Sequence, residues 1–385
     1  MNNMATSTWI ADGAHGNLAS TAANWDTPPA AGRDILFNAS SVVNCTFDLT
    51  LALGAYLQNT GYSGVVTQAA SFSVTSFALV AGTWTPNTTY TLTNSGNFTA
   101  SGGAISNVYF NMIMTGDGTT LSCNSNYFPF GCLTINANVA TWGPTYMPQV
   151  YNAGSPSLVV AIGKTLTLGA GGLVLFGRAC QQIANSGTIA GTGTLIIQLY
   201  TQDATMGSLG IVTAPVEIVN RGDSPANRKV TLGADVVLGG ALTVDSGHAT
   251  YTMELHHGSN YILTVAGAVV QGTRGLITQG TGRWTWGSFT QSGASSIFTQ
   301  GGFLIVEGTA TISNGTNWAV NENGTVDALT QSGGVITVAT GKVLYYEKTL
   351  SQTGGSSTGT IAQFQARKQP PIQPAANRPV DVTNL

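Results

Sequence analysis

The chain has 385 residues, of which 43% are hydrophobic and only 8% are charged, against about 25% charged in an ordinary soluble domain. The apolar share excludes a disordered chain. A net charge of −3 without a basic patch excludes a nucleic-acid-binding surface. The polar residues are mainly Thr, Ser, Asn, Gln and 49 Gly, which favour strands and tight turns over helices.

The N-terminal segment contains a recognisable pattern. Trp9 is followed by Asn24-Trp25, and then by Gly32-Arg-Asp34 and Ile35-Leu-Phe37. The pattern resembles the opening of bacterial and phage β-solenoid surface proteins, among them autotransporter-like β-helical repeats and phage virion proteins. The resemblance implies a parallel β-helix on a virion or a cell surface, and it implies no catalytic residue. From the residues themselves, we expect Trp9 and Trp25 to cover the open end of an apolar stack.

Residues 1–154 contain short alternating runs with less regular spacing, such as Phe72-Ser-Val74 and Asn97-Phe-Thr99. We assign them to an N-terminal cap and an irregular β region. The stretch 127–151 is rich in aromatic residues and Pro, which indicates an irregular insertion or boundary loop. Its aromatic side chains are candidates for a contact surface, with core packing as the competing interpretation. They are Tyr127, Phe128, Phe130, Trp142 and Tyr146.

Residues 155–362 carry the clearest repeat. Similar strands open at Leu242, Leu263, Trp284 and Leu304, a regular interval of about 21 residues, and periods of this size indicate a solenoid. Gln-x-Gly markers recur in other phases, as in Gln291-Ser-Gly293. Such a period, with two or three short strands in each unit, is typical of one turn of a parallel β-helix. Trp284 and Trp286 are further candidates for the contact surface.

The sequence therefore predicts an all-β fold, a parallel β-solenoid with coils of about 21 residues. One coil cannot bury its apolar side chains alone, but stacked coils can place Leu, Val and Ile in inward ladders with Thr, Ser and Asn outside. The competing fold is a string of small β-sandwiches, which would lack such ladders.

Residues 363–385 differ from the repeats because they are rich in Pro, which disfavours both helix and central strand. We expect an extended tail that docks on a neighbouring subunit; a disordered tail is the alternative. The candidate partner-docking residues are Phe364, Arg367, Lys368, Pro370, Pro371, Pro374 and Arg378.

Histidines and carboxylates gather between residues 245 and 257, and such groups can bind zinc. Their spacing matches no metal site, and consecutive His256 and His257 should point to opposite faces of a strand. Cys123 and Cys132 could bridge a loop, but we expect buried thiols. Arg221-Gly-Asp223 is interpreted as a solvated turn. We predict no metal site and no cofactor.

Pairs of carboxylates on adjacent coils could cleave a glycosidic bond. With coils of about 20 residues, Asp203 would meet Asp223, and Glu307 would meet Asp327. The alternative is that these are isolated surface charges that keep the solenoid soluble. No phosphate-binding or nucleophile motif is present. We therefore predict no catalytic residue.

The favoured function is a non-enzymatic structural virion protein, associated with a capsid, fibre or tail. No signal peptide or transmembrane stretch is evident, so we expect assembly in the host cytoplasm and no membrane insertion. The expected partners are other virion proteins or copies of the chain itself, as a homo-oligomer such as a trimer, and a host-surface glycan. The alternatives are a secreted bacterial adhesin at the cell surface and a polysaccharide-degrading tailspike.

Overall fold

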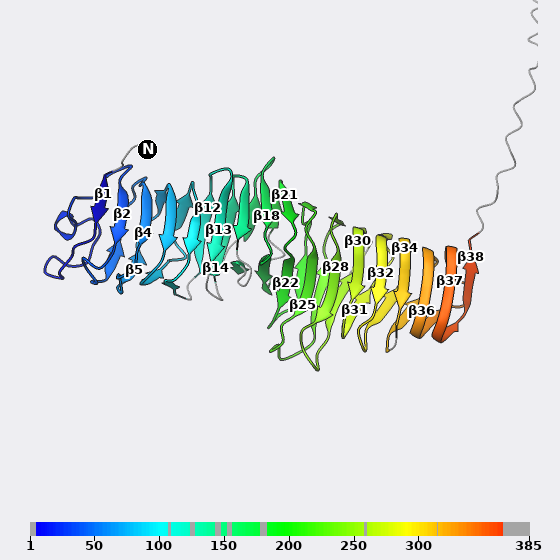
Figure 1. Ribbon diagram of the computed structural model, residues 1–385. Coiled ribbons are helices and arrows are strands. Elements are labelled where there is room, and N and C mark those ends of the chain that lie inside the picture. The colour runs from blue at the N-terminus through cyan, green and yellow to red at the C-terminus, as the bar shows by residue number, and fades with distance from the viewer. Residues whose placement is uncertain are drawn as a thin grey trace, which may run out of the picture.

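The computed structural model describes residues 5–106, 109–123, 128–142, 148–151, 156–177, 183–257, 260–313 and 315–364. It is an all-β parallel solenoid, a rod of stacked coils (Figure 1). Every pairing between two of its described strands is parallel. The described residues contain no α-helix, and η1 (Ala22–Asn24) is a short 3₁₀ turn. The predicted fold class is confirmed.

Each coil contributes strands to three parallel ladders, named A, B and C here in their order along a coil. Ladder A runs the full length of the rod. It begins with β1 (Thr6–Thr8), β2 (Asp34–Phe37), β4 (Ala55–Gln58), β7 (Ser76–Leu79), β10 (Phe98–Ala100), β13 (Thr119–Cys123), β15 (Val139–Trp142), β18 (Thr165–Leu168), β21 (Thr188–Gly191), β24 (Ile211–Val212) and β27 (Val236–Leu238).

Ladder B begins as a separate sheet of four strands and continues within the main sheet. The separate sheet consists of β3 (Cys45–Phe47), β5 (Val65–Gln68), β8 (Thr83–Thr85) and β11 (Ala104–Ile105). The later strands are β14 (Phe128–Ile135), whose second half belongs to ladder C, β16 (Pro148–Tyr151), β19 (Leu173–Phe176), β22 (Leu195–Leu199), β25 (Val216–Asn220) and β28 (Leu242–Ser246).

Ladder C completes the coil. Its strands are β6 (Phe72–Val74), β9 (Thr91–Asn94), β12 (Phe110–Met114), β17 (Leu158–Val160), β20 (Ile183–Asn185), β23 (Ala204–Met206), β26 (Arg228–Leu232), β29 (Met253–His257), β31 (Gly275–Thr278), β33 (Ile297–Gln300) and β35 (Asn317–Val320).

Toward the C-terminal end the strands of different ladders fuse into longer ones. Ladders A and B share β30 (Leu263–Gln271), β32 (Trp284–Gln291) and β34 (Leu304–Ile312). All three ladders share β36 (Gly324–Val338) and β37 (Val343–Thr358), and β38 (Thr360–Gln363) ends ladder A.

The coil period is visible in the register of ladder A. Ile35 pairs with Tyr56, Tyr56 with Phe77 and Phe77 with Phe98. Each step is about 21 residues, the period expected of a solenoid coil. The solenoid therefore includes the region before residue 155, where the sequence spacing looks less regular. Pairing of β15 with β18 carries ladder A across residue 154 without interruption.

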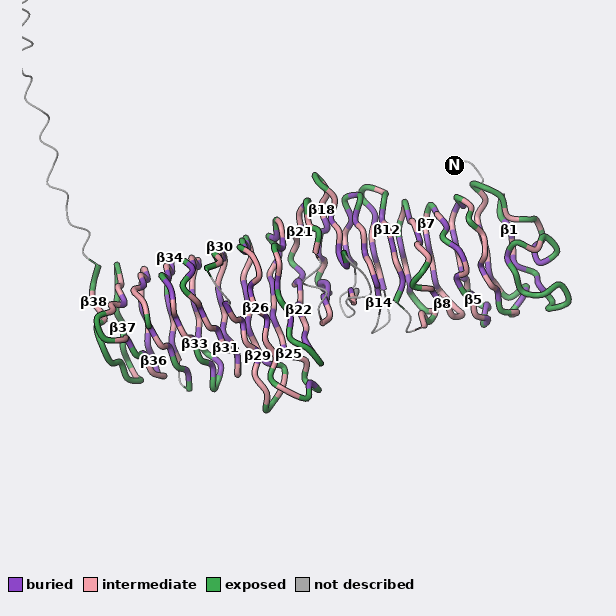
Figure 2. Tube along the Cα trace, turned by 180° about the vertical axis from the view of Figure 1, so that it is seen from behind, coloured by how far each residue is buried: buried purple, intermediate pink, exposed green. Residues whose placement is uncertain are grey.

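The interior of the rod is filled by side chains that alternate with outward ones along each strand (Figure 2). Large aromatic residues stack from coil to coil. Phe77 stacks on Tyr56 and on Phe98, with ring centroids 4.6 Å and 4.7 Å apart and nearly parallel planes. Such contacts add to the free energy of apolar burial and fix the register between coils.

A second aromatic cluster fills the interior of the C-terminal half. Several residues predicted to form a contact surface are buried, so that part of the prediction is wrong. Trp284 and Trp286 are 0% exposed inside β32, and Phe130 is 0% exposed inside β14. Apolar packing is the reason, so these three residues cannot form a contact surface. Phe128 and Trp142 lie in β14 and β15 with side chains outside the description. Tyr127 and Tyr146 lie outside the described residues.

The N-terminal end of the stack is closed by two tryptophans, as predicted. Trp9 and Trp25 are buried and meet edge to face at 5.0 Å, above Phe37. The indole Nε1 of Trp9 donates to the carbonyl of Val43, and that of Trp25 donates to the carbonyl of Ala19. Both polar groups are thus satisfied within the cap.

The glutamines of the Gln-x-Gly markers form side-chain hydrogen bonds that join one coil to the next, and each such set of bonds is called a bracket here. The Nε2 of the buried Gln291 donates to the carbonyl of Ser296 in its own coil, at 3.2 Å, and to Asn317 in the next, at 2.8 Å. Gln271 and Gln331 make the same pair of bonds. Each bracket satisfies backbone carbonyls at a corner where the chain leaves the ladder.

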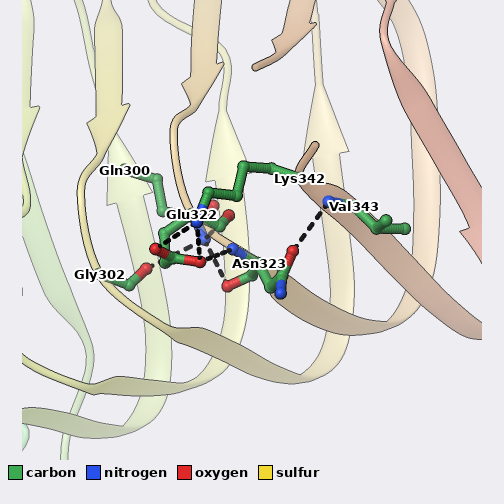
Figure 3. Close-up of polar contacts among 6 residues, drawn as sticks. All are labelled: Gln300, Gly302, Glu322, Asn323, Lys342 and Val343. Carbon is green, nitrogen blue, oxygen red and sulfur yellow. Dashed lines mark hydrogen bonds and ion pairs between the residues drawn. The ribbon is translucent and has the colours of Figure 1, made fainter. Parts of the chain in front are cut away.

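A related bracket joins Gln300 to the following coil (Figure 3). Its Nε2 donates to the carbonyls of Gly302, Glu322 and Asn323 at 3.1, 3.0 and 3.0 Å. The Glu322 carboxylate accepts from Lys342 Nζ at 2.8 Å. The Lys342 ammonium therefore holds the pKa of Glu322 below its usual range.

Candidate functional site

Of the two carboxylate pairs predicted from the coil spacing, Asp203 and Asp223 are not brought together. Glu307 and Asp327, in contrast, directly follow two residues that pair between β34 and β36. Asp203 accepts from the backbone N–H of Lys229 at 2.9 Å, and Asp223 forms an ion pair with Arg221 at 2.8 Å. Asp327 forms an ion pair with Lys348 at 3.0 Å. Each of these three aspartates thus has a structural partner of its own. The prediction for Asp203 was wrong because coils in the middle of the rod are longer than the repeat on which it was based.

The structure instead places Glu217 and Asp245 on neighbouring strands of ladder B. In the register of β25 and β28, Glu217 pairs with Thr243 and Val219 with Asp245. Both carboxylates alternate with buried residues, so they stand on the outer face. Partial burial, and then the charge of Asp245, raise the pKa of Glu217 above its ordinary value. Burial also raises the pKa of Asp245.

The histidines do not converge. His256 lies 3.0 Å from Glu254 on the outer face of β29, whereas His257 is buried and hydrogen-bonded to the carbonyl of Tyr261. Their opposite orientation is as predicted. Over the part of the chain that the structure describes, no three His, Cys, Asp or Glu residues form a group suited to a metal ion. Cys123 and Cys132 are free thiols.

Burial makes His257 a source of acid sensitivity. Its ring meets Trp284 edge to face at 5.5 Å, and desolvation lowers the pKa of His257 in the folded state. The imidazole of His257 therefore binds a proton at about pH 6.5 in the unfolded chain but only at a lower pH in the folded chain. Stability is retained above that pH and falls as the pH decreases toward the lower folded pKa.

When the pH is lowered from about 7.5 to about 5.5, we expect wild type to lose more stability than His257→Gln. The difference is expected to reach a factor of up to about ten in the unfolding equilibrium constant for each pH unit. Urea unfolding at both pH values measures the difference. His15→Gln, at an exposed side chain, is the control and should follow wild type. Equal pH dependence of wild type and His257→Gln would contradict the assignment.

Among the described residues, a groove on the outer face of ladder B is a concave site. It has a volume of about 320 Å³ and is lined by residues of β16 and β19 and by residues that follow β22. Its described lining residues are aromatic or uncharged: Tyr109, Tyr151, Phe176, Gly177, Tyr200, Thr201 and Gln202. Tyr151 belongs to the aromatic stretch singled out in the sequence. The other lining residues were not anticipated.

The rings of the groove form a row along the rod. Tyr109 and Tyr151 have centroids 4.7 Å apart, and Tyr151 and Phe176 are 4.8 Å apart. The distance between Tyr151 and Phe176 matches the spacing of adjacent coils, about 4.8 Å. Tyr109 lies further along the register, because Phe110 pairs with Phe130 and Phe130 with Val150. The register of β16 and β19 explains the row, because Tyr151 pairs directly with Phe176 on the outer face.

Arg221 closes one end of the row. Its guanidinium carbon lies 5.6 Å from the ring centre of Phe176 and 5.3 Å from that of Tyr200, within the range of a cation–π contact. The guanidinium also pairs with Asp223. Arg221-Gly-Asp223 is therefore not a freely solvated turn, because its arginine is held against the groove.

The C-terminal end of the solenoid is the other notable surface. Along β37, every residue from Glu347 to Thr358 is exposed, apart from a half-buried Gly354 (Figure 2). Within the described part of the chain, β38 covers only Val343–Tyr346. Phe364 follows β38, donates its N–H to the carbonyl of Tyr346 and is 47% exposed. The remaining tail candidates lie outside the described residues.

No described helix is long and apolar enough to cross a membrane. Comparison of the chain with protein-family models, with curated proteins and with solved structures gives no match in any of the three. The function therefore has to be argued from the chain's own residues.

Proposed function

We propose that the chain is a non-enzymatic structural protein, a solenoid rod attached to a larger assembly through its C-terminal end. The observation that supports this proposal is the asymmetry of the two ends. Trp9 and Trp25 close the N-terminal end, whereas no described strand pairs with β37 beyond Tyr346. Solenoids need covered ends for solubility, and an open strand edge is a template for pairing with another strand.

The inward side chains also stop abruptly at this end. In ladder B, Phe289 pairs with Ala310, Ala310 with Leu329 and Leu329 with Leu350. The first three are buried, but Leu350 is 37% exposed because no described strand follows it. A further coil from a partner would bury Leu350 and pair the free edge of β37, which is strand addition.

The chain's own tail is a poor source of that coil. Its sequence contains Pro370, Pro371 and Pro374, and Pro cannot donate to a ladder. We therefore infer that the coil comes from another subunit, with Phe364, Arg367, Lys368 and the tail prolines as additional docking residues.

The closed N-terminal end restricts the assembly. Head-to-tail stacking would need an open N-terminal face, so copies of the chain would meet through two C-terminal ends or dock on a different protein. We favour a virion as the assembly, because the N-terminal motif resembles virion solenoid proteins. A bacterial cell-surface adhesin is the alternative location.

Leu350→Lys is expected to abolish assembly at the C-terminal end, because it places a charge in the inward ladder where a partner coil would pack. Val237→Lys is the matched control, since Val237 is 60% exposed on β27. Light scattering and electron microscopy of the full chain would measure self-association. Binding to purified particles would measure docking on another protein.

We expect wild type and Val237→Lys to associate and Leu350→Lys to remain monomeric and unbound. Wild type that stays monomeric and binds no particle would overturn the proposal. Equal association of all three proteins would do the same.

A polysaccharide-degrading tailspike is the second candidate, and Glu217 and Asp245 favour it. A carboxyl group with a raised pKa beside a second carboxylate is the usual arrangement of a glycoside-cleaving site. Release of reducing ends from polysaccharides by wild type, and its loss in Glu217→Gln, would support this candidate. Absence of release by wild type would exclude it.

A further inference from the structure

The aromatic groove is not required by the fold. The interior of the coils is already filled by other side chains: Leu173 and Leu175 of β19 are 0% exposed, while Phe176 points to the outer face. Tyr109 is 37% exposed, and Tyr151, Phe176 and Tyr200 are half-buried. A row of rings left partly open to solvent, in a concave site, is a feature that marks binding surfaces.

The rim of the groove is polar and neutral. Thr201 and Gln202 are exposed at its edge and offer a hydroxyl and an amide. The Tyr151 hydroxyl lies 2.7 Å from the Gln149 side-chain oxygen, on the same outer face. Arg221, the cation that contacts the rings of the groove, forms an ion pair with Asp223 at 2.8 Å. The described lining therefore offers ring faces and hydrogen-bonding groups and contains no charged side chain.

We propose that this groove binds a neutral saccharide. A pyranose ring has apolar C–H faces bordered by hydroxyl groups. The faces would lie against the rings of Tyr109 and Tyr151, while the hydroxyls would meet Thr201 and Gln202. Aromatic side chains that are apolar in the body and polar at the tip suit such a ligand.

The size of the groove favours a saccharide over a protein partner. A volume of about 320 Å³ is at the lower limit for small-molecule sites, about 300–1,000 Å³. A stable protein interface buries about 800 Å² on each partner and centres on a well-packed apolar core. The groove offers a short row of rings with a polar rim, which fits a few sugar units.

Arg221 acts as a positioning residue. Its guanidinium lies against Phe176 and Tyr200, and Tyr200 is further held through its carbonyl, which accepts from Ser224 Oγ and Arg228 Nε at 2.8 and 2.5 Å. The end of the row is thereby fixed before a ligand arrives. Such preorganisation reduces the entropic cost of binding.

Affinity electrophoresis of the full chain through gels that contain dextran, glycogen, galactomannan, xylan or a chitin oligomer would test the site. We expect retardation by at least one neutral saccharide and an affinity at least about tenfold weaker for Tyr151→Ala. Tyr151→Phe, which keeps the ring, should retain most of the affinity. Gln202→Ala, at an exposed side chain, should weaken binding without any effect on folding.

Phe303→Ala is the matched control. Phe303 is 39% exposed and lies under Arg283 at 5.9 Å, a similar ring–arginine pair away from the groove. We expect it to bind like wild type. Absence of retardation by every neutral saccharide would overturn the proposal. Equal affinities of wild type, Tyr151→Ala and Gln202→Ala would also overturn it. Leu350→Lys should bind like wild type, so failure of C-terminal docking is distinguishable from failure of this site.

Discussion

Replacement of Trp286 by alanine is expected to destabilise the C-terminal half of the rod by about 3–5 kcal/mol. Trp286 is 0% exposed, and its ring contacts Trp284, Phe289 and Phe298 at centroid distances of 5.6, 5.0 and 5.2 Å. The variant loses the free energy of burying the indole and leaves a cavity between coils. Close packing around the site prevents the neighbours from refilling it.

Hydrogen exchange is the suitable measurement for Trp286→Ala, because coils of a solenoid contact only their neighbours and open locally. Protection should fall in β30 to β36 and stay close to wild type in β2 to β10. Val237→Ala, at a residue 60% exposed, should leave both regions unchanged. A loss below about 1 kcal/mol in the C-terminal half would show that the aromatic cluster contributes little to stability.

The fold could be predicted because corner residues repeat in the C-terminal half. Gln271, Gln291 and Gln331 share one position of the register, called a column here, in which Ile312 stands between Gln291 and Gln331. The N-terminal coils have the same period, as in Tyr56 and Phe77, but their corners use other residues. The period of these coils is hard to recognise in the sequence, because the inward position that repeats is occupied by different large apolar residues.

The inward or outward direction of aromatic residues could have been predicted from alternation. Trp284-Thr-Trp286 places both tryptophans on the face opposite Thr285, and the structure buries that face. The same argument applied to Leu173-Val-Leu-Phe176 directs Phe176 outward. Composition alone gives no such direction, so it leaves both a contact surface and core packing open for the tryptophans.

The groove and the acidic pair could not be predicted, because they depend on coil lengths that the sequence does not reveal. Val216 pairs with Leu242, which is a longer step along the chain than the step from Tyr56 to Phe77 in the N-terminal coils. Glu217 therefore lies beside Asp245, whereas Asp203 meets Lys229. A few added residues at one corner change which outward side chains become neighbours, while the inward apolar pattern remains unchanged.

Substitution of Gln291 by leucine is expected to destabilise the rod by about 1–3 kcal/mol. Gln291 is 0% exposed, and its Nε2 is a donor to the carbonyls of Ser296 and Asn317. Loss of the amide removes one donor from each carbonyl, although the carbonyl of Ser296 still accepts from the N–H of Asn317 at 3.0 Å. The cost is therefore that of the lost side-chain hydrogen bonds. Denaturant unfolding, with hydrogen exchange of β33 and β35, measures the effect.

Two other residues of the same column separate the effect of the lost hydrogen bonds from an effect of side-chain volume. Ile312 pairs with Gln291 and is itself buried, so an aliphatic side chain fits this position. Gln352 occupies the column on the exposed last coil, so Gln352→Leu should change stability by less than about 0.5 kcal/mol. If Gln291→Leu were as stable as wild type, the brackets would set only the register of the coils. If both variants lost equal stability, burial would not determine the strength of the bracket.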